Sequence, residues 1–290
     1  MDLCERLKSG DLGGAIRSAL ESVRSNASDP ETRFLLAELL CFRGEFSKAD
    51  SHLEVVSKQS PELGLSAVHR RQLIRAASIR QSCFGEGVVP EFLPPIDANA
   101  RFQLKLWAEH RAGDGAAVSD LQSRLNRYCD ELTGSCNGQR FRGFADLDDS
   151  TQSCLELLTA TGRYFWIPWH RIESLDFEPV KRPRDLLWRS VRVRVRDGPE
   201  SIAYIPVQCP LTSSAHGDAA VLGRETSWEE RPTGVTVGIG QRILRVGDED
   251  VPVLELSSLS FDELDQALTL HDESDDLGTT DDGDGGDRRR

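Results

Sequence analysis

The chain has 290 residues and carries 35 basic against 48 acidic side chains, which gives a net charge of −13 at pH 7. This length favours two domains, and the negative charge argues against general binding to nucleic-acid backbones. The seven cysteines form no CxxC pair, and we find neither a signal peptide nor the apolar run of about 18 residues that a membrane span needs. We therefore expect a cytoplasmic protein with reduced thiols, whose partners are neither nucleic acids nor membranes.

A helical pattern recurs at a spacing of 34 residues near the start of the chain, which is the tetratricopeptide period. The matching residues are Leu3, Leu7, Gly10, Leu12, Ala15 and Ala19 in the first copy and Ala37, Cys41, Gly44, Phe46, Ala49 and Leu53 in the second. Each copy predicts two helices joined by a tight turn at Gly10 or Gly44, with a small residue where the helices pack. An ordinary helical hairpin is the alternative.

Further helices are predicted beyond the repeat. Residues 64–83 place apolar side chains on one side and arginines on the other. Residues 85–95 hold two glycines and three prolines, so they predict a linker or an extended crossover. Residues 102–107 and 116–132 again have apolar residues at three- and four-residue steps, which indicates two amphipathic helices.

Beyond residue 140 the periodicity changes from helical to alternating. Residues 191–195 alternate valine with arginine, as a half-buried antiparallel strand requires. Residues 201–207, 235–246 and 251–256 behave similarly, and residues 247–250 form a plausible turn that joins the last two strands into a hairpin.

The C-terminal end differs from the rest of the chain in composition and in predicted structure. Residues 261–270 predict a short amphipathic helix with Ser260 as its N-cap. Residues 272–290 are mainly Asp, Gly, Ser and Thr, with too little apolar content to form a core, so we expect a disordered acidic tail that favours solubility.

The fold class that follows is α+β, with a tetratricopeptide-like α-helical domain followed by a mainly antiparallel β domain. We expect helical repeats in residues 1–83, a linker and further helices in 84–139, the mostly β domain in 140–262, and a short helix with the acidic tail in 263–290.

Five segments carry unusual residues in a fixed order: 143–148, 162–175, 182–188, 222–228 and 240–242. This ordered set resembles the ImpE family, accessory proteins of bacterial type VI secretion, over roughly residues 1–262. None of these motifs is catalytic, and we expect them to have structural roles. The motif residues in question are Trp166, Pro168, Arg182, Asp185, Trp188, Arg224 and Trp228.

Large apolar side chains are dense in one of these segments. They are Tyr164, Trp166, Ile167, Trp169 and Ile172. Such residues bury large areas while their polar tips find partners. They predict either a buried seam between the helical and β parts or an exposed patch for a partner.

An enzyme is the less favoured interpretation. His170, Glu173, Asp176 and Asp185 are close in sequence, but HExxH, paired CxxC and GxSxG patterns are lacking. Residues 234–240 look like a phosphate loop without its third glycine or a following Lys-Ser/Thr, so we expect their glycines to mark bulges or close backbone approach in a strand. We therefore expect no catalytic residue, metal or cofactor, and keep a hydrolase or metal enzyme on the β domain as an alternative.

Resemblance to the ImpE family implies capture of the N-terminal helix of the small contractile-sheath subunit, and an effect on sheath disassembly by the cognate ATPase. A generic peptide-binding adaptor or chaperone cofactor is the alternative. Helices dock by laying apolar anchors into a groove, and the first helix of each tetratricopeptide unit would provide it. The predicted contacts are Phe34, Glu38, Cys41, Phe42, Val68 and Gln72. Alternatively, Phe34 and Phe42 pack only against the neighbouring helix.

Overall fold

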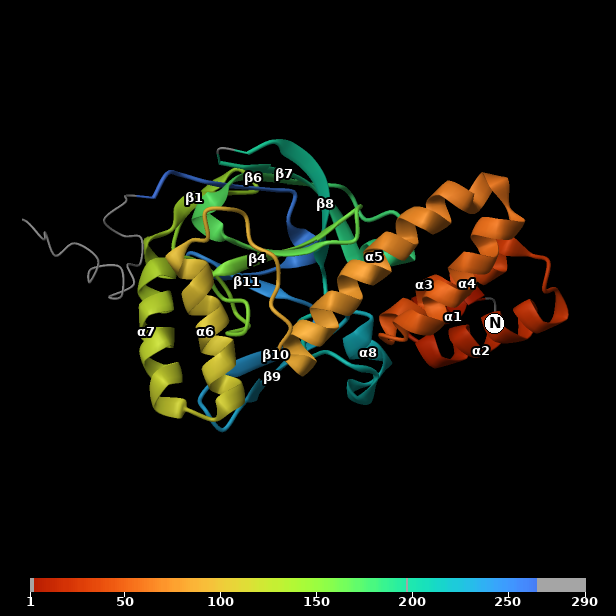
Figure 1. Cartoon of the computed structure of the whole chain (residues 1–290), viewed down its shortest axis with the longest axis horizontal. Helices are drawn as coiled ribbons and strands as arrows, with labels where there is room; N and C mark the ends of the chain where they lie inside the picture. The colour runs from red at the N-terminus through yellow and green to blue at the C-terminus, as the bar shows by residue number, and fades with distance from the viewer. Residues whose placement is uncertain (1–2, 197, 265–290) are drawn as a thin grey trace, which may run out of the picture.

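The computed structural model describes residues 3–196 and 198–264 and has the predicted α+β class (Figure 1). In this described part, seven α-helices precede the first strand. They are α1 (Leu3–Ser9), α2 (Leu12–Ser25), α3 (Pro30–Phe42), α4 (Phe46–Gln59), α5 (Pro61–Glu86), α6 (Ala98–Ala112) and α7 (Gly115–Glu131). The helices predicted at 64–83, 102–107 and 116–132 correspond to α5, α6 and α7. Among these described helices, none is both long enough and apolar enough to cross a membrane.

Helices α1 to α5, here called the helical unit, follow the predicted repeat. Gly10 and Gly44 occupy equivalent turns with φ of +88° and +69°, a left-handed conformation that glycine adopts without strain. Ala15, Ala37 and Ala49 are fully buried, which lets neighbouring helices approach closely. Successive helices pack against one another from α1 to α5, consistent with a tetratricopeptide-like arrangement.

Helix α5, the last helix of the helical unit, extends toward the strands. Helices α6 and α7 lie at the end of the molecule away from α1 to α4 (Figure 1). The crossover predicted at 85–95 begins later than expected, because Gly85 and Glu86 still belong to α5, and the connection between α5 and α6 comprises residues 87–97. There the Glu91 N–H donates to the Tyr164 carbonyl, and the Glu91 carbonyl accepts from the Trp166 N–H, both at 3.0 Å. The linker is thus tied to the edge of the neighbouring sheet.

Residues 133–261, here called the β part, hold antiparallel strands in three sheets. The large sheet has the order β2 (Gln139–Arg142), β1 (Thr133–Cys136), β13 (Ser258–Phe261), β6 (Ile172–Phe177), β7 (Trp188–Val195), β8 (Glu200–Pro206), β4 (Cys154–Thr159), β5 (Tyr164–Pro168). The smaller sheets are β12 (Glu249–Pro252), β11 (Ile243–Val246), β3 (Phe144–Asp146), and β10 (Thr236–Gly240), β9 (Thr226–Glu230). The predicted strands at 191–195 and 201–207 are β7 and β8, and the predicted hairpin joins β11 to β12.

Two predicted strands differ in detail. The segment 235–246 is two strands, β10 and β11, in different sheets. Gly240 between them has φ of +114°, and a Cβ there would lie 1.9 Å from the Glu225 carbonyl oxygen, so the chain turns where two backbones meet. The strand predicted at 251–256 ends at Pro252 and continues as the 3-10 turn η4 (Val253–Glu255).

The predicted helix start at Ser260 is wrong. Ser260 lies within β13, which pairs with β1 and β6. The alternation in this strand buries Leu259 and Phe261 in the sheet core, and this packing prevails over a local capping signal. The rest of that predicted helix from residue 265, and the predicted tail, lie outside the described residues.

The hydrophobic core is continuous between the helical unit and the β part. One buried cluster joins Leu53 and Phe84 of the helices to Trp166 and Trp188 of the strands, and a second fills the large sheet. Tyr164, Trp166, Ile167, Trp169 and Ile172 are all buried. All five side chains are therefore buried, so the predicted exposed patch is wrong. Tyr164 and Trp166 lie in the cluster that joins the helical unit to the β part, as the predicted seam requires, whereas Ile167, Trp169 and Ile172 lie in the second cluster. The predicted domain boundaries stay a prediction.

Candidate functional site

A groove of about 630 Å³ runs between α4 and α5. Phe46 and Val68 supply apolar surface, and Val68 is 48% exposed. One rim holds Asp50 and Arg71, whose guanidinium donates from Nε to Oδ1 at 2.7 Å and from Nη2 to Oδ2 at 3.0 Å. Gln72 lies in the same lining. The groove combines an apolar strip with polar rims, as a site for an amphipathic segment does.

The predicted partner-binding residues do not form one surface. Val68 and Gln72 line the groove. Cys41 and Phe42 are each 2% exposed and line a second hollow of about 230 Å³, between the α3–α4 turn, α5 and the β part. The two hollows share Phe46. Val68 and Gln72 are more exposed than Cys41 and Phe42, so the groove is the more accessible of the two hollows.

Glu38 lies on the side of α3 that the β part approaches. Glu38 is buried, 3.6 Å from Arg70 of α5 and 3.7 Å from Arg184 of the 3-10 turn η2 (Pro183–Leu186). Burial raises the pKa of Glu38 above its ordinary value, although both arginines oppose the shift. Phe34 is half-buried and packs against the main core. Glu38 therefore holds two parts of the chain together in this structure.

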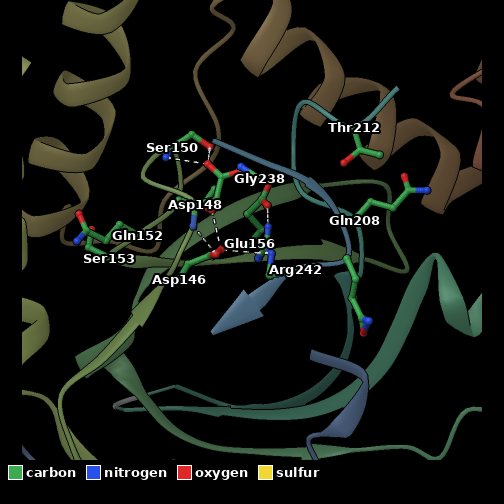
Figure 2. Close-up of polar contacts among 12 residues, drawn as sticks. Asp146, Asp148, Ser150, Gln152, Ser153, Glu156, Gln208, Thr212, Gly238 and Arg242 are labelled. Carbon is green, nitrogen blue, oxygen red and sulfur yellow. Dashed lines mark hydrogen bonds and ion pairs between the residues drawn. The ribbon is translucent and has the colours of Figure 1, made fainter. Parts of the chain in front are cut away.

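A buried cluster of charged residues joins α5 to the β part, centred on Glu156 of β4. Glu156 has no exposed surface. Arg80 of α5 donates to it from Nε at 2.7 Å and from Nη2 at 2.8 Å, and to the Gln208 carbonyl at 3.0 Å. Arg242 and the Tyr164 hydroxyl donate to the same carboxylate. Figure 2 shows Glu156 and Arg242 pointing toward each other.

The loop after β3 completes this cluster. Asp146 lies 3.3 Å from Arg242 Nε and accepts from the Thr151 hydroxyl at 2.7 Å. Asp148 accepts from the Ser150 backbone N–H and from the Gly238 N–H of β10, both at 3.0 Å. The loop is thereby held in contact with β10 (Figure 2).

The carboxyl group of Asp148 has an unusually high pKa. Burial, together with the neighbouring Asp146 charge, raises the pKa of Asp148 to about 7, although hydrogen bonds from Ser150 and Gly238 oppose the shift. A raised pKa in a carboxyl group often marks a catalytic acid. Here Asp146, Asp148 and Glu156 are all buried and already accept hydrogen bonds or ion pairs from the chain. The cluster therefore supports the fold, and its arrangement offers no surface for a substrate.

His170, Glu173 and Asp185, three of the residues of the alternative catalytic or metal set, each have separate partners, and the fourth, Asp176, is exposed on β6. His170 contacts the Tyr128 hydroxyl at 2.9 Å through Nδ1 and Asp97 at 3.1 Å through Nε2. Glu173 pairs with Arg194, and Asp185 accepts from backbone N–H groups in its own turn. Burial acts to raise the pKa of Asp97, but the hydrogen bond and charge of His170 outweigh it, so the pKa is lowered. This pattern ties the start of α6 to α7 and to the strands.

Comparison with known proteins identifies the family. A family model described as ImpE protein matches residues 138–260. The type VI secretion system accessory component TagJ of Pseudomonas aeruginosa is 30% identical over 268 residues, which cover 90% of this chain and 91% of TagJ. The chain belongs to the ImpE family. The crystal structure of VPA1032 from Vibrio parahaemolyticus matches 92% of this chain and 100% of its own, with a TM-score of 0.83 and 26% identity.

The ImpE motif residues divide into buried and exposed sets. Trp166, Pro168 and Trp188 are buried; Trp166 donates from Nε1 to the Tyr164 hydroxyl at 2.5 Å, and Trp188 stacks on Phe46 with centroids 6.4 Å apart. Trp166 and Trp188 thus pack the seam between the helical unit and the β part, while Pro168 pairs with Cys154 within the large sheet.

The remaining ImpE motif residues lie nearer the surface. Asp185 caps η2 by accepting the Lys181 and Arg182 N–H groups at 2.9 Å. The Arg182 side chain is exposed. Arg224 donates to the Leu7 carbonyl at the start of the helical unit, and Trp228 is 40% exposed on β9. Their structural role stays a prediction.

Sequence reasoning missed two residues of the charged cluster, Arg80 and Glu156. A signal for Glu156 was present, because it is the single charged residue in the apolar strand 154–159, and lone charges in such strands are rarely buried without a partner. Arg80 had no such signal, since α5 carries several arginines and only the tertiary structure distinguishes the one that reaches β4.

Proposed function

We propose that this protein is a non-enzymatic accessory protein of the type VI secretion system that acts in the cytoplasm. It binds the N-terminal helix of the small contractile-sheath subunit and thereby modulates sheath disassembly by the cognate ATPase. Membership of the ImpE family and similarity to TagJ, a type VI secretion accessory component, support the accessory role. The helix as ligand follows from the resemblance and from the shape of the site.

The observation that carries the proposal is the groove between α4 and α5. An α-helix with its side chains is about 10 Å across, and it binds by placing one apolar face into such a groove. Phe46 and Val68 provide the apolar contact surface, and Asp50, Arg71 and Gln72 provide polar rims. Two of the predicted contact residues, Val68 and Gln72, lie in this lining.

The burial of the carboxylates in the charged cluster supports a binding role over catalysis. A catalytic carboxyl group must reach its substrate. Glu156 and Asp148 have no exposed surface, and their oxygens are occupied by Arg80, Arg242, Ser150 and Gly238. Polar groups held in this way stabilise a fold.

Two measurements test the proposal. A tagged copy of the full chain is purified from cells that express the secretion genes, and recovery of sheath subunits is expected. A synthetic peptide of the sheath subunit's N-terminal helix is then titrated by calorimetry into the wild type and into Val68→Asp. The aspartate introduces a charge into the apolar strip, so affinity should fall at least tenfold.

Val89→Asp is the matched control, because Val89 is an exposed valine in the linker outside the groove. It should bind as the wild type does. Equal binding by Val68→Asp and the wild type would place the helix elsewhere, and recovery of unrelated proteins without sheath subunits would favour the generic adaptor.

A further inference from the structure

One arginine in the groove has no counter-ion in the described part of the chain. Arg75 of α5 is exposed and lines the groove between α4 and α5. The other two charges in this lining pair with each other, since Arg71 donates two hydrogen bonds to Asp50. Arg71 also lies 3.8 Å from Glu54, which is outside the lining and forms its own ion pair with Lys58. The groove lining thus holds one acidic and two basic side chains, a net charge of +1, on a chain whose net charge is −13.

The β part helps to position Arg75. The turn between β4 and β5 contains Gly162, with φ of +82°. A Cβ at this glycine would lie 3.1 Å from Cδ of Arg75 and 2.6 Å from Oε1 of Gln72. The turn therefore packs directly against the Arg75 stem, which limits the directions that the guanidinium can take. The groove lining itself belongs to α4 and α5, and the β part acts on it through this contact with Gln72 and Arg75.

From this geometry we infer that the groove selects an amphipathic helix that carries a carboxylate beside its apolar anchors, and that Arg75 pairs with this carboxylate. The inference rests on the proposed function, because it assigns the chemistry of the helix that the groove binds. Charge complementarity is the reason: an acidic segment is repelled by most of this acidic chain and attracted only where positive charge is in excess. Val68 and Phe46 would receive the anchors while Arg75 fixes the register.

Charged residues at the rim of an interface act mainly on the association rate and its salt dependence. The experiment therefore measures association of the sheath-subunit helix peptide with the full chain at low and high salt. Arg75→Glu should lower the affinity about tenfold, or about 1.4 kcal/mol, with most of the change in the association rate. For the wild type, salt should slow association, and for Arg75→Glu this effect should shrink or reverse.

A matched control is Arg24→Glu, which makes the same charge change at an exposed arginine of α2 outside the groove. It should leave the affinity within twofold of the wild type. A second peptide, in which the acidic residues of the helix are replaced by lysine, should bind Arg75→Glu more tightly than it binds the wild type.

The outcomes separate the two proposals. If the peptide binds neither the wild type nor any variant, the proposed function itself fails. If it binds the wild type and Arg75→Glu equally, the helix is captured but the role of Arg75 is overturned. If Arg75→Glu binds the native peptide more tightly, an acidic segment of this chain occupies the groove in place of the partner, and the inference is equally overturned.

Discussion

Arg80 on α5 and Glu156 on β4 form a two-point contact, with Nε 2.7 Å from Oε1 and Nη2 2.8 Å from Oε2. The two residues are 76 positions apart in the chain. Planar guanidinium and carboxylate groups match each other in this geometry, which gives direction as well as energy. The contact therefore fixes how α5 meets the large sheet, and so how the groove on α5 faces the β4–β5 turn.

Removing the Glu156 carboxylate should destabilise the protein strongly. Glu156→Ala leaves Arg80 without its acidic partner and Arg242 with only Asp146, and breaking a buried ion pair by deleting one partner costs about 3–5 kcal/mol. Urea unfolding followed by circular dichroism measures the loss. Glu200→Ala is the control, since Glu200 forms exposed ion pairs with Arg192 and Arg194, and such surface pairs contribute little to stability. A Glu156→Ala variant as stable as this control would contradict the role of the cluster.

A larger side chain at Ala49 tests the close helix packing that the predicted repeat requires. Ala49 of α4 is fully buried where the helices pack, so Ala49→Leu should lower the free energy of unfolding by about 1–3 kcal/mol. Ser51→Leu places the same side chain at an exposed position of the same helix and should change stability little. An unchanged melting temperature for Ala49→Leu would count against close packing at this position.

Alanine substitutions at two glycines, compared with each other, test the contact between the β4–β5 turn and α5. Gly162 and Gly138 have φ of +82° and +85°, so alanine at either position costs about 1–2 kcal/mol in backbone strain. Only at Gly162 would the new Cβ meet neighbouring atoms, those of Gln72 and Arg75, whereas nothing lies within 4 Å at Gly138. Gly162→Ala should therefore be the less stable variant by calorimetric melting and should weaken peptide binding. Equal losses in both variants would show that the turn yields without cost.

Asp148 should make stability depend on pH. Its pKa rises from the ordinary 3.8 to about 7 on folding, so between these values the folded state holds a proton that the unfolded state has lost. Stability from this group is present at low pH and is lost as the pH rises from about 4 to about 7. Asp148→Asn removes the titration. Between pH 5 and pH 7 the wild type should lose about 2 kcal/mol more than the variant in urea unfolding; parallel curves would refute the assignment.

Patterns that depend on neighbouring residues were predictable from the sequence. The 34-residue spacing located the turns at Gly10 and Gly44, because a helical hairpin needs a glycine at a left-handed turn. Alternation located β7 and β8 for the same local reason. The failure at Ser260 shows the limit, since Leu259 and Phe261 gain more by burial between β1 and β6 than a cap could supply.

The candidate site was predictable only in part. Spacing along α5 pointed to Val68 and Gln72, which line the groove. It also pointed to Glu38 and Phe42 on α3. Segments from distant sequence, η2 and β7, approach that helix, so Glu38 forms an internal ion pair with Arg184 at 3.7 Å. Periodicity reports which side of a helix is apolar, and it carries no information about which other segment will cover that side.

By itself, the sequence determined the helical repeat, the alternating strands, the family and the acidic character of the chain, because each depends on composition or on spacing over a few turns. Only the tertiary structure decided that Arg80 reaches Glu156, that Gly162 packs on Arg75, and that the groove opens between α4 and α5. The first two contacts join residues 76 and 87 positions apart in the chain. Such pairs form because the continuous core brings α5 against the sheet, and that packing is a property of the whole chain.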